Sequence, residues 1–274
     1  MKRSYRLGIS IACLLYVACS IVWADSPEPL APEQRLDKSP RHHQWEQVET
    51  KTGRKVRAFV VFPEVDKPVP AVVVIHENRG LNAWARSLAD QVAEMGYVAV
   101  APDLLSGSGP NGGGTDSFPS EDAAREAIYK LSDEQVQEDL SAVIAFARKL
   151  EATGDEVAVA GFCWGGGQTF RAAAHQPDIA AACVFYGSAP DEDVLKNIKV
   201  PVHGFYGGND FRITGQVPKV EETMKKLGKT YEPVTYKGAG HGFMRSGESA
   251  APDSADREAR NQAWTRWRKI LGAL

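Results

Sequence analysis

The chain has 274 residues, of which 43% are hydrophobic and 24% are charged, and its formal net charge is −3. This composition is ordinary for a globular protein, and the length suits one sizeable α/β domain or two small ones. The small negative charge excludes the strongly basic character expected of a protein that binds nucleic acid or an anionic membrane.

The first residues have the pattern of an export signal. A basic start and an apolar stretch from Leu7 to Trp23 precede Ala24, the small residue expected before a signal-peptidase cut. We therefore expect residues 1–24 to be a signal peptide and the mature chain, periplasmic or secreted, to begin at Asp25. Its removal takes away three positive charges and changes the formal net charge from −3 to −6.

Two alternatives remain open for this segment. The apolar run of 17 residues is near the lower limit for a bilayer-spanning helix, so it could be a retained membrane anchor. Residues 16–19 (YVAC) also have a faint likeness to a lipoprotein cleavage site, which would place a lipid on Cys19. With cleavage at Ala24, no stable membrane anchor is expected.

Cleavage at this point would leave two cysteines, Cys163 and Cys183. In an oxidising compartment the two could form one disulfide. Cys183, however, lies in an apolar run that predicts a buried strand, where a thiol behaves as a small apolar side chain. This position argues against the disulfide and leaves Cys163 to be explained.

Residues 25–45 are rich in Pro, Glu, Lys and His, a composition that favours a flexible lead-in. The adjacent His42 and His43 could bind a metal ion, but no further ligands accompany them, and such a pair is usually solvated. No change of composition divides residues 46–274, so we expect a single domain there.

From residue 56 onward, strand patterns alternate with helix patterns. Strands are predicted over 56–63, 70–76, 97–103, 157–162, 179–186, 200–207 and 232–238. Helices are predicted over 83–96, from a capping box at Ser132 and Gln135 to Leu150, and over 165–175, 216–227 and 254–274. The alternation predicts an α/β fold with a mainly parallel sheet and helices on both faces.

A Gly/Ser-rich loop over residues 105–117 lies between two of these elements. It lacks the Gly-Lys-Ser/Thr ending of a phosphate-binding loop, so it does not predict nucleotide binding. It could instead border the mouth of a substrate pocket.

The sequence GFCWG at residues 161–165 has the form Gly-x-Cys-x-Gly, directly after an apolar strand and before a helix. This is the context of a nucleophile elbow, a sharp strand-to-helix turn. The glycines would remove collisions, the helix N-terminus would favour a thiolate at Cys163, and the backbone N–H of Trp164 could stabilise an oxyanion. The alternative is a buried cysteine in a glycine-rich turn.

Asp210 and His241 complete the chain order nucleophile, acid, histidine, and each follows a predicted strand on a glycine-flanked loop. We predict that Cys163, Asp210 and His241 form a catalytic triad at the carboxyl ends of the strands. Asp210 could instead form a turn, and His241 could be a solvated loop residue. Three other histidines compete for the role of base, but none lies on a loop after both other residues: His76, His175 and His203.

These residues and the motifs GFCWGGG (161–167) and AGHGFMR (239–245) resemble those of the dienelactone hydrolases, a family that uses cysteine where most relatives use serine. The similarity covers roughly residues 56–272. The separations of 47 residues between the cysteine and the aspartate, and of 31 between the aspartate and the histidine, are close to the family's pattern. The resemblance implies an α/β-hydrolase fold with a mainly parallel, twisted sheet, and implies no cofactor and no metal.

The resemblance implies roles for further residues. Glu77 would sit near the thiol in the resting site, and the backbone N–H of Asn78 would be the second oxyanion donor beside that of Trp164. Arg245 would hold a substrate carboxylate, and Tyr186 would lie close to the nucleophile. Each side chain also has a simpler interpretation: Glu77 as a loop carboxylate, Arg245 as a surface cation and Tyr186 as core packing.

One position departs from the family. Better-known members carry a second carboxylate-binding arginine soon after the strand that ends in PDL, where this chain has Gly107. Arg79, on the opposite loop, could supply a replacement charge.

We therefore expect an exported hydrolase of carboxylic esters, with lactones or enol esters preferred, that forms a thioester on cysteine. It would act on a small molecule as a monomer or small homo-oligomer. The alternatives are a general aryl-ester or thioester hydrolase with the same triad, or a non-catalytic binding protein on the same fold. A thiol redox protein is disfavoured because the chain has no Cys-x-x-Cys.

Overall fold

The computed structural model of the protein describes residues 30–249, 251 and 253–274, so the predicted signal peptide lies outside the described residues. The strands are β1 (His43–Glu49), β2 (Lys55–Val61), β3 (Val69–Ile75), β4 (Val98–Asp103), β5 (Thr153–Phe162), β6 (Ala181–Phe185), β7 (Val202–Gly207) and β8 (Tyr231–Tyr236). The α-helices are α1 (Pro32–Lys38), α2 (Ala83–Glu94), α3 (Glu121–Ile128), α4 (Asp133–Ala147), α5 (Trp164–His175), α6 (Glu192–Leu195), α7 (Phe211–Thr214), α8 (Val217–Lys226), α9 (Phe243–Ser249) and α10 (Ala255–Leu271). Two short 3₁₀ helices, η1 (Pro110–Gly112) and η2 (Thr115–Ser117), lie between β4 and α3.

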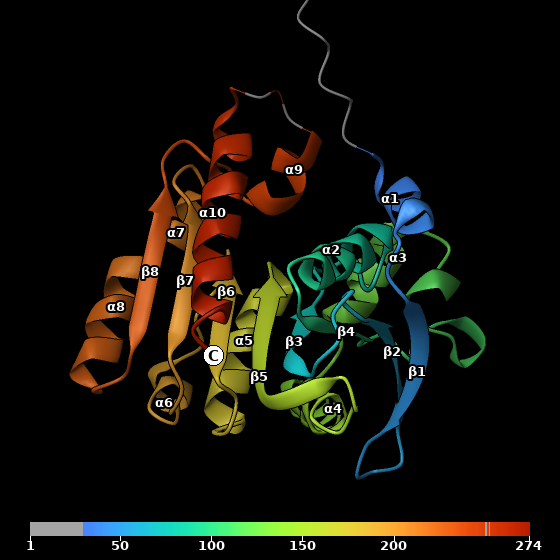
Figure 1. Ribbon diagram of the computed structural model, residues 1–274. Helices are drawn as coiled ribbons and strands as arrows, with labels where there is room; N and C mark the ends of the chain where they lie inside the picture. Colours follow the sequence, from blue (N-terminus) through green and yellow to red (C-terminus); the bar gives the residue numbers. More distant parts are fainter. Residues whose placement is uncertain (1–29, 250, 252) are drawn as a thin grey trace, which may run out of the picture.

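The described strands form one eight-stranded sheet in the order β1-β2-β4-β3-β5-β6-β7-β8, which Figure 1 shows from β1 on the right to β8 on the left. Strands β3 to β8 run parallel. β2 pairs antiparallel with β4, and β1 pairs antiparallel with β2. The predicted α/β fold with a mainly parallel sheet is confirmed.

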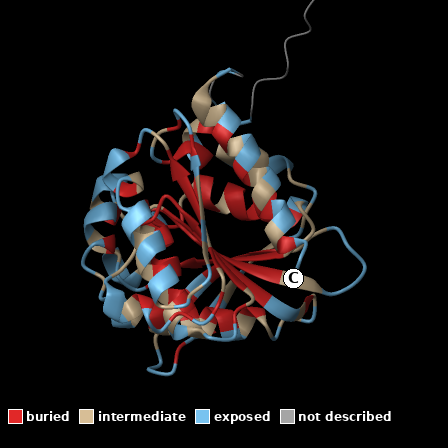
Figure 2. Cartoon of the chain, turned by 90° about the vertical axis from the view of Figure 1, so that its left-hand side faces the viewer, coloured by how far each residue is buried: buried red, intermediate tan, exposed pale blue. Residues whose placement is uncertain are grey.

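Each face of the sheet is covered by helices, because the central strands carry apolar side chains on both faces. Along β3, Ala71, Val73 and Ile75 pack into the cluster that includes α4 and α5. Val72 and Val74 point the other way, into the cluster that includes α2 and α10. Figure 2 shows the buried strands between outer helix faces that are mostly exposed.

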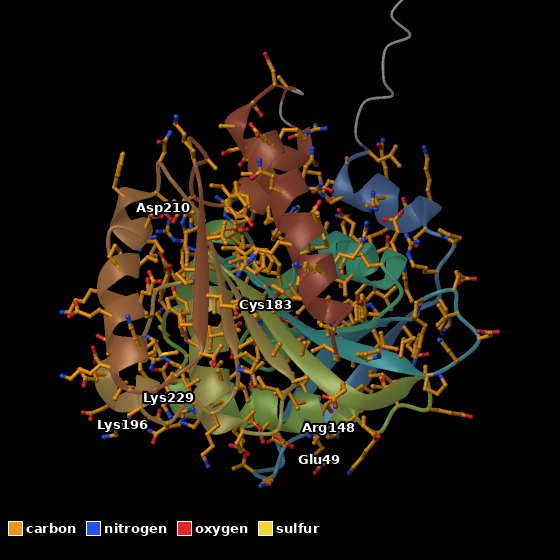
Figure 3. All side chains as sticks on the ribbon, turned by 60° about the vertical axis from the view of Figure 1, so that its left-hand side comes forward. Glu49, Arg148, Cys183, Lys196, Asp210 and Lys229 are labelled. Carbon is orange, nitrogen blue, oxygen red and sulfur yellow. The ribbon has the colours of Figure 1, made fainter. Side chains whose placement is uncertain are left out.

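The carboxyl ends of the parallel strands meet at one edge of the sheet, as the topology requires. The loops after β3, β5, β6, β7 and β8 begin there and carry the residues singled out in the sequence. Figure 3 shows Asp210 at this edge, above Cys183, which lies within β6 in the middle of the sheet. The second cysteine is therefore a core side chain.

Residues 30–45 are more regular than the flexible lead-in that the sequence predicted. Residues 32–38 form α1, and β1 begins at His43. The segment is fixed by Asp90 of α2, whose fully buried carboxylate accepts hydrogen bonds from Arg41 Nε (2.9 Å), Arg41 Nη2 (2.7 Å) and Ser39 Oγ (2.5 Å) and contacts His43 Nε2 (3.0 Å). The polar composition of this segment could not predict the contact, because Asp90 lies about fifty residues downstream.

Smaller differences concern element ends. β5 begins at Thr153 instead of residue 157, because Thr153 pairs with Val69 across a bulge. α4 ends at Ala147, short of Leu150. Half of the predicted capping box is present: Ser132 Oγ accepts from the Gln135 N–H (3.2 Å), but the Gln135 side chain makes no return bond within the described residues.

The Gly/Ser-rich loop folds onto Asp103 at the end of β4. The carboxylate of Asp103 accepts hydrogen bonds from the Thr115 N–H (2.8 Å) and from Thr115 Oγ1 (2.6 Å). In the part of the chain that the structure describes, no helix has both the length and the apolar character needed to cross a membrane.

We predict that Asp90→Asn lowers the free energy of unfolding by about 3 kcal/mol, because it removes the buried charge that Arg41 and His43 face. Burial raises the pKa of Asp90, but its hydrogen bonds from Arg41, Ser39 and His43 outweigh burial and leave the pKa lowered. Its stabilising effect should therefore be present above about pH 4 and be lost as the pH falls further.

Urea unfolding at pH 7 and at pH 3 would measure both effects. The matched control is Asp178→Asn, which removes an exposed pair with Arg148 and should cost less than about 1 kcal/mol. Equal losses in the two variants would contradict the role given to Asp90.

Candidate active site

Cys163 occupies a strained turn between β5 and α5. Its backbone has φ 56° and ψ −115°, which is unfavourable for a residue with a side chain. A Cβ at Gly161 would lie 2.1 Å from the carbonyl oxygen of Gly165, and one at Gly165 would lie 2.4 Å from that of His76. Both positions therefore require glycine, for the steric reason that the sequence suggested.

The structure brings together Cys163, His241 and Asp210. His241 follows β8, and its Nε2 lies 3.1 Å from Cys163 Sγ. Its Nδ1 lies 2.5 Å from Oδ2 of Asp210, the residue that caps α7 after β7. Asp210 is buried, whereas the cysteine is partly exposed. The arrangement allows proton exchange between sulfur and imidazole, with the carboxylate holding the ring.

The environment of His241 favours a charged imidazolium. Its hydrogen bond with Cys163 raises the pKa, burial opposes this, and the hydrogen bond with Asp210 adds to the increase, so that the pKa is about 9. At neutral pH the ring is then mostly protonated, and a cation lies within hydrogen-bond distance of the sulfur. Such a neighbour stabilises a thiolate.

Glu77 joins a second polar group beside the sulfur. Its Oε2 accepts a hydrogen bond from Arg245 Nε (2.9 Å), and its Oε1 accepts one from the Tyr186 hydroxyl (3.2 Å). The hydrogen bonds of Glu77 go to these two residues, whereas the sulfur contacts His241. That Glu77 lies near the thiol stays a prediction. Burial lowers the pKa of Arg245, yet the adjacent Glu77 charge outweighs it and leaves the pKa raised.

Tyr186 is both a core residue and a neighbour of the site. It is fully buried after β6, with a left-handed φ of 41°. Its ring packs edge-on against His241, with centroids 5.1 Å apart. Burial, followed by the negative charges of Glu77 and Cys163, raises its pKa well above the ordinary value, so the hydroxyl stays protonated and donates to Glu77.

Within the described residues, the backbone N–H groups of Asn78 and Trp164 have no protein acceptor. Trp164 is the first residue of α5, where backbone N–H groups lack an intrahelical partner. The Asn78 side chain is held by its Nδ2, which donates to the Tyr129 hydroxyl at 3.1 Å. Both N–H groups are available to an oxyanion.

His76 supports the loop that carries Asn78. It is buried, its Nδ1 lies 2.7 Å from the Glu77 carbonyl oxygen, and its Nε2 accepts from the Leu104 N–H at 3.4 Å. Its ring stacks on Trp164 with an interplanar angle of 13°. Burial lowers its pKa, so it remains a neutral structural residue.

The remaining sequence candidates lie elsewhere. His175 bonds the carbonyl oxygen of Arg171, and His203 contacts Glu232. Arg79 pairs with Glu121 at 2.5 Å, with both side chains about half exposed. Among the described residues, no group of three or more His, Cys, Asp or Glu side chains could hold a metal ion.

A cavity of about 240 Å³ opens beside Cys163 and His241. It lies against α5, α7 and the loop after β6, and none of the Gly/Ser-rich loop 105–117 lines it. Its lining includes residues that the sequence analysis did not single out: Tyr129, Gln168, Arg171, Ser188 and Arg212. Two signals could have found the arginines: Arg171 lies on the same helical face as Trp164, and Arg212 follows Asp210 by two positions.

Known proteins are similar to this chain over most of its length. The profile of the dienelactone hydrolase family matches residues 56–274. A protein of Methylorubrum extorquens named "Putative carboxymethylenebutenolidase" is 32% identical over 200 residues, which cover 69% of this chain and 68% of that protein. A protein of the same name from Escherichia coli K12 is 30% identical over 204 residues, covering 70% of this chain and 74% of the relative.

A solved structure has the same fold. The "Putative Dienelactone Hydrolase" of Klebsiella pneumoniae superposes with a TM-score of 0.74 at 26% identity. The match covers 85% of this chain and 99% of the other.

We predict that Cys163→Ala lowers the pKa of His241 from about 9 toward about 6.5, because the hydrogen bond to sulfur is the largest contribution to the increase. Asp210→Asn should lower it by a smaller amount. The measurement is an NMR titration of the imidazole, with the signal assigned by its loss in His241→Gln. A midpoint that stays near 9 in Cys163→Ala would contradict this account.

Proposed function

Because this chain belongs to the dienelactone hydrolase family, we propose that it hydrolyses carboxylic esters, with lactones and enol esters preferred, through Cys163, His241 and Asp210. The observation that carries the proposal is the pair of contacts at His241: 3.1 Å from Nε2 to the sulfur and 2.5 Å from Nδ1 to the carboxylate. The cavity beside these atoms gives a small ester access to the sulfur.

In the first half-reaction, the Cys163 thiolate attacks the ester carbonyl carbon. The carbonyl oxygen becomes an oxyanion, which the backbone N–H groups of Asn78 and Trp164 can stabilise. One such donor is typically worth about 100- to 1000-fold in rate. The C–O bond then breaks, His241 gives a proton to the departing oxygen, and the acyl group remains on sulfur as a thioester.

In the second half-reaction, the neutral imidazole of His241 takes a proton from water, which attacks the thioester. The oxyanion forms and collapses again, and the carboxylic acid leaves as sulfur regains its charge. Asp210 keeps Nδ1 protonated and the ring in place through both halves. No further group is needed to balance either step.

The choice of sulfur narrows the substrate class. A thiolate attacks readily near neutral pH, but it is also a good leaving group. The tetrahedral intermediate therefore reverts unless the substrate's own leaving group is better. Enol and aryl oxygens meet this condition by themselves, whereas plain alkyl oxygens and amide nitrogens depend on protonation as they leave, so the activated esters are favoured.

We also propose that the protein is exported, on the strength of the basic start, the apolar stretch and Ala24 in the sequence. N-terminal sequencing of the protein purified from a Gram-negative host is expected to give Asp25. Retention of residues 1–24 would contradict the proposed signal peptide, and a lipid on Cys19 would contradict cleavage after Ala24 while leaving export in place.

The catalytic proposal predicts that Cys163→Ala and His241→Ala each lower kcat/KM by at least about 1000-fold on 4-nitrophenyl acetate and on an enol lactone. The matched control is Cys183→Ala, which removes the second thiol of the described residues, buried in the core, and should retain turnover. Iodoacetamide should alkylate Cys163 alone and abolish activity in proportion. Undiminished turnover in both triad variants would exclude the mechanism, and alkylation without any turnover would favour a binding protein.

A further inference from the structure

We propose that a hollow between α1, α2, α9 and α10 binds a phosphate group. The hollow has a volume of about 410 Å³, and residues of all four helices line it. None of the described residues that line it also lines the cavity at Cys163. Figure 1 shows α1 beside α2, and α9 beside α10. The site is therefore separate from the proposed catalytic residues, and the inference stands apart from the proposed function.

The lining of this hollow is positively charged. Two carboxylates and four guanidiniums line it, and the residues are Glu94, Glu248, Arg35, Arg257, Arg260 and Arg268. The described lining therefore has two more positive than negative charges. A phosphate group carries about −1.5 to −2 at neutral pH and offers several acceptor oxygens to planar guanidiniums. It matches this excess, whereas a carboxylate would leave part of it unbalanced.

One face of α10 supplies most of the positive charge. Arg257, Arg260, Trp264 and Arg268 follow one another at intervals of three or four residues, so they lie on the same side of the helix. The guanidinium of Arg260 lies 5.7 Å from the centroid of the Trp264 ring, which itself stacks on Trp267. This cation–π contact helps to orient the guanidinium.

Arg260 is fixed by protein on one side and open on the other. Its Nε donates to the Met244 carbonyl oxygen (3.1 Å), and its Nη2 donates to Gln91 Oε1 and lies 3.4 Å from Glu248 Oε1. Its Nη1 has no partner among the described residues and remains accessible to solvent. The N–H groups of Nη1 are therefore held in place and available to a ligand oxygen.

The charges in the hollow are incompletely balanced. Burial lowers the pKa of Arg260, and the charge of Glu248 opposes this effect. The nearby guanidiniums of Arg35 and Arg257 lower the pKa further, so it stays below its usual value. Like charges thus lie close together where water is partly excluded, which strengthens their repulsion. An anion bound among them would offset this repulsion.

Two groups in the lining are accessible to a ligand. Arg268 is exposed, and in the part of the chain that the structure describes it has no hydrogen-bond or ion-pair partner. Arg35 pairs through its Nη2 with Glu94, whose side chain is 54% exposed. An exposed pair of this kind contributes little free energy, so a phosphate can displace Glu94 from Arg35. Loss of Arg268 and loss of the Glu94 charge should therefore have opposite effects on binding.

The test follows the indole N–H signal of Trp264 by NMR while inorganic phosphate is added to the purified protein. The signal is assigned by its loss in Trp264→Phe, and it reports on this hollow separately from the catalytic cavity. Phosphate is expected to give a saturable shift that weakens as salt is added. Acetate at equal ionic strength should bind about tenfold more weakly, because it has fewer acceptor oxygens and less charge.

Arg268→Gln and Arg260→Gln are each expected to weaken phosphate binding about tenfold, whereas Glu94→Gln should tighten it about threefold because a competing carboxylate is lost. The matched control is Arg148→Gln, which removes an exposed charge paired with Asp178 outside the hollow and should leave the affinity unchanged. Because Arg268 is exposed, its variant tests the site even if Arg260→Gln lowers stability.

The phosphate group could belong to a soluble ester or to a lipid headgroup, and sedimentation with vesicles separates these sources. Binding to phosphatidylglycerol vesicles but not to phosphatidylcholine vesicles, lost in Arg268→Gln, would support the site with a lipid as its ligand. Phosphate binding without vesicle binding would support it with a soluble ligand. The inference is overturned if phosphate leaves the Trp264 signal unmoved, if acetate binds equally well, or if both arginine variants bind phosphate as wild type does.

Discussion

The left-handed backbone at Cys163 is the constraint on which the site depends. This backbone conformation is stabilised because successive glycines let the first turn of α5 contact the chain directly after β3 and after β6. A Cβ at Gly165 would meet the carbonyl oxygens of Ile75 and His76 at the end of β3. One at Gly166 would meet the carbonyl oxygen of Phe185 and the Cα and N atoms of Gly187 after β6. This close packing brings the Asn78 loop, the Trp164 N–H and the Tyr186 ring to one point. The run of glycines thus assembles the surroundings of the sulfur as well as its turn.

The features that the sequence predicted best are those that depend on local pattern and on the order of residues along the chain. The strand-to-helix turn at Cys163, and loops at strand ends for Asp210 and His241, follow from periodicity and glycine placement, and parallel strands necessarily bring those loops to one edge. The contact of Asp90 with the N-terminal segment was not predictable, since no local signal indicates which polar segment a buried carboxylate selects. The sequence did not predict the Glu77–Arg245 pair for the same reason, because the two residues are 168 positions apart.

The distribution of charge around the sulfur explains why Arg245 and Arg212 differ. Arg245 is half-buried, and its charge is largely matched by Glu77, so a ligand carboxylate would have to compete with an existing partner. Competition of this kind costs the desolvation and the hydrogen bonds of the displaced group. Arg212 has no such competitor among the described residues and remains in solvent. The two arginines therefore differ in what a bound anion would have to displace.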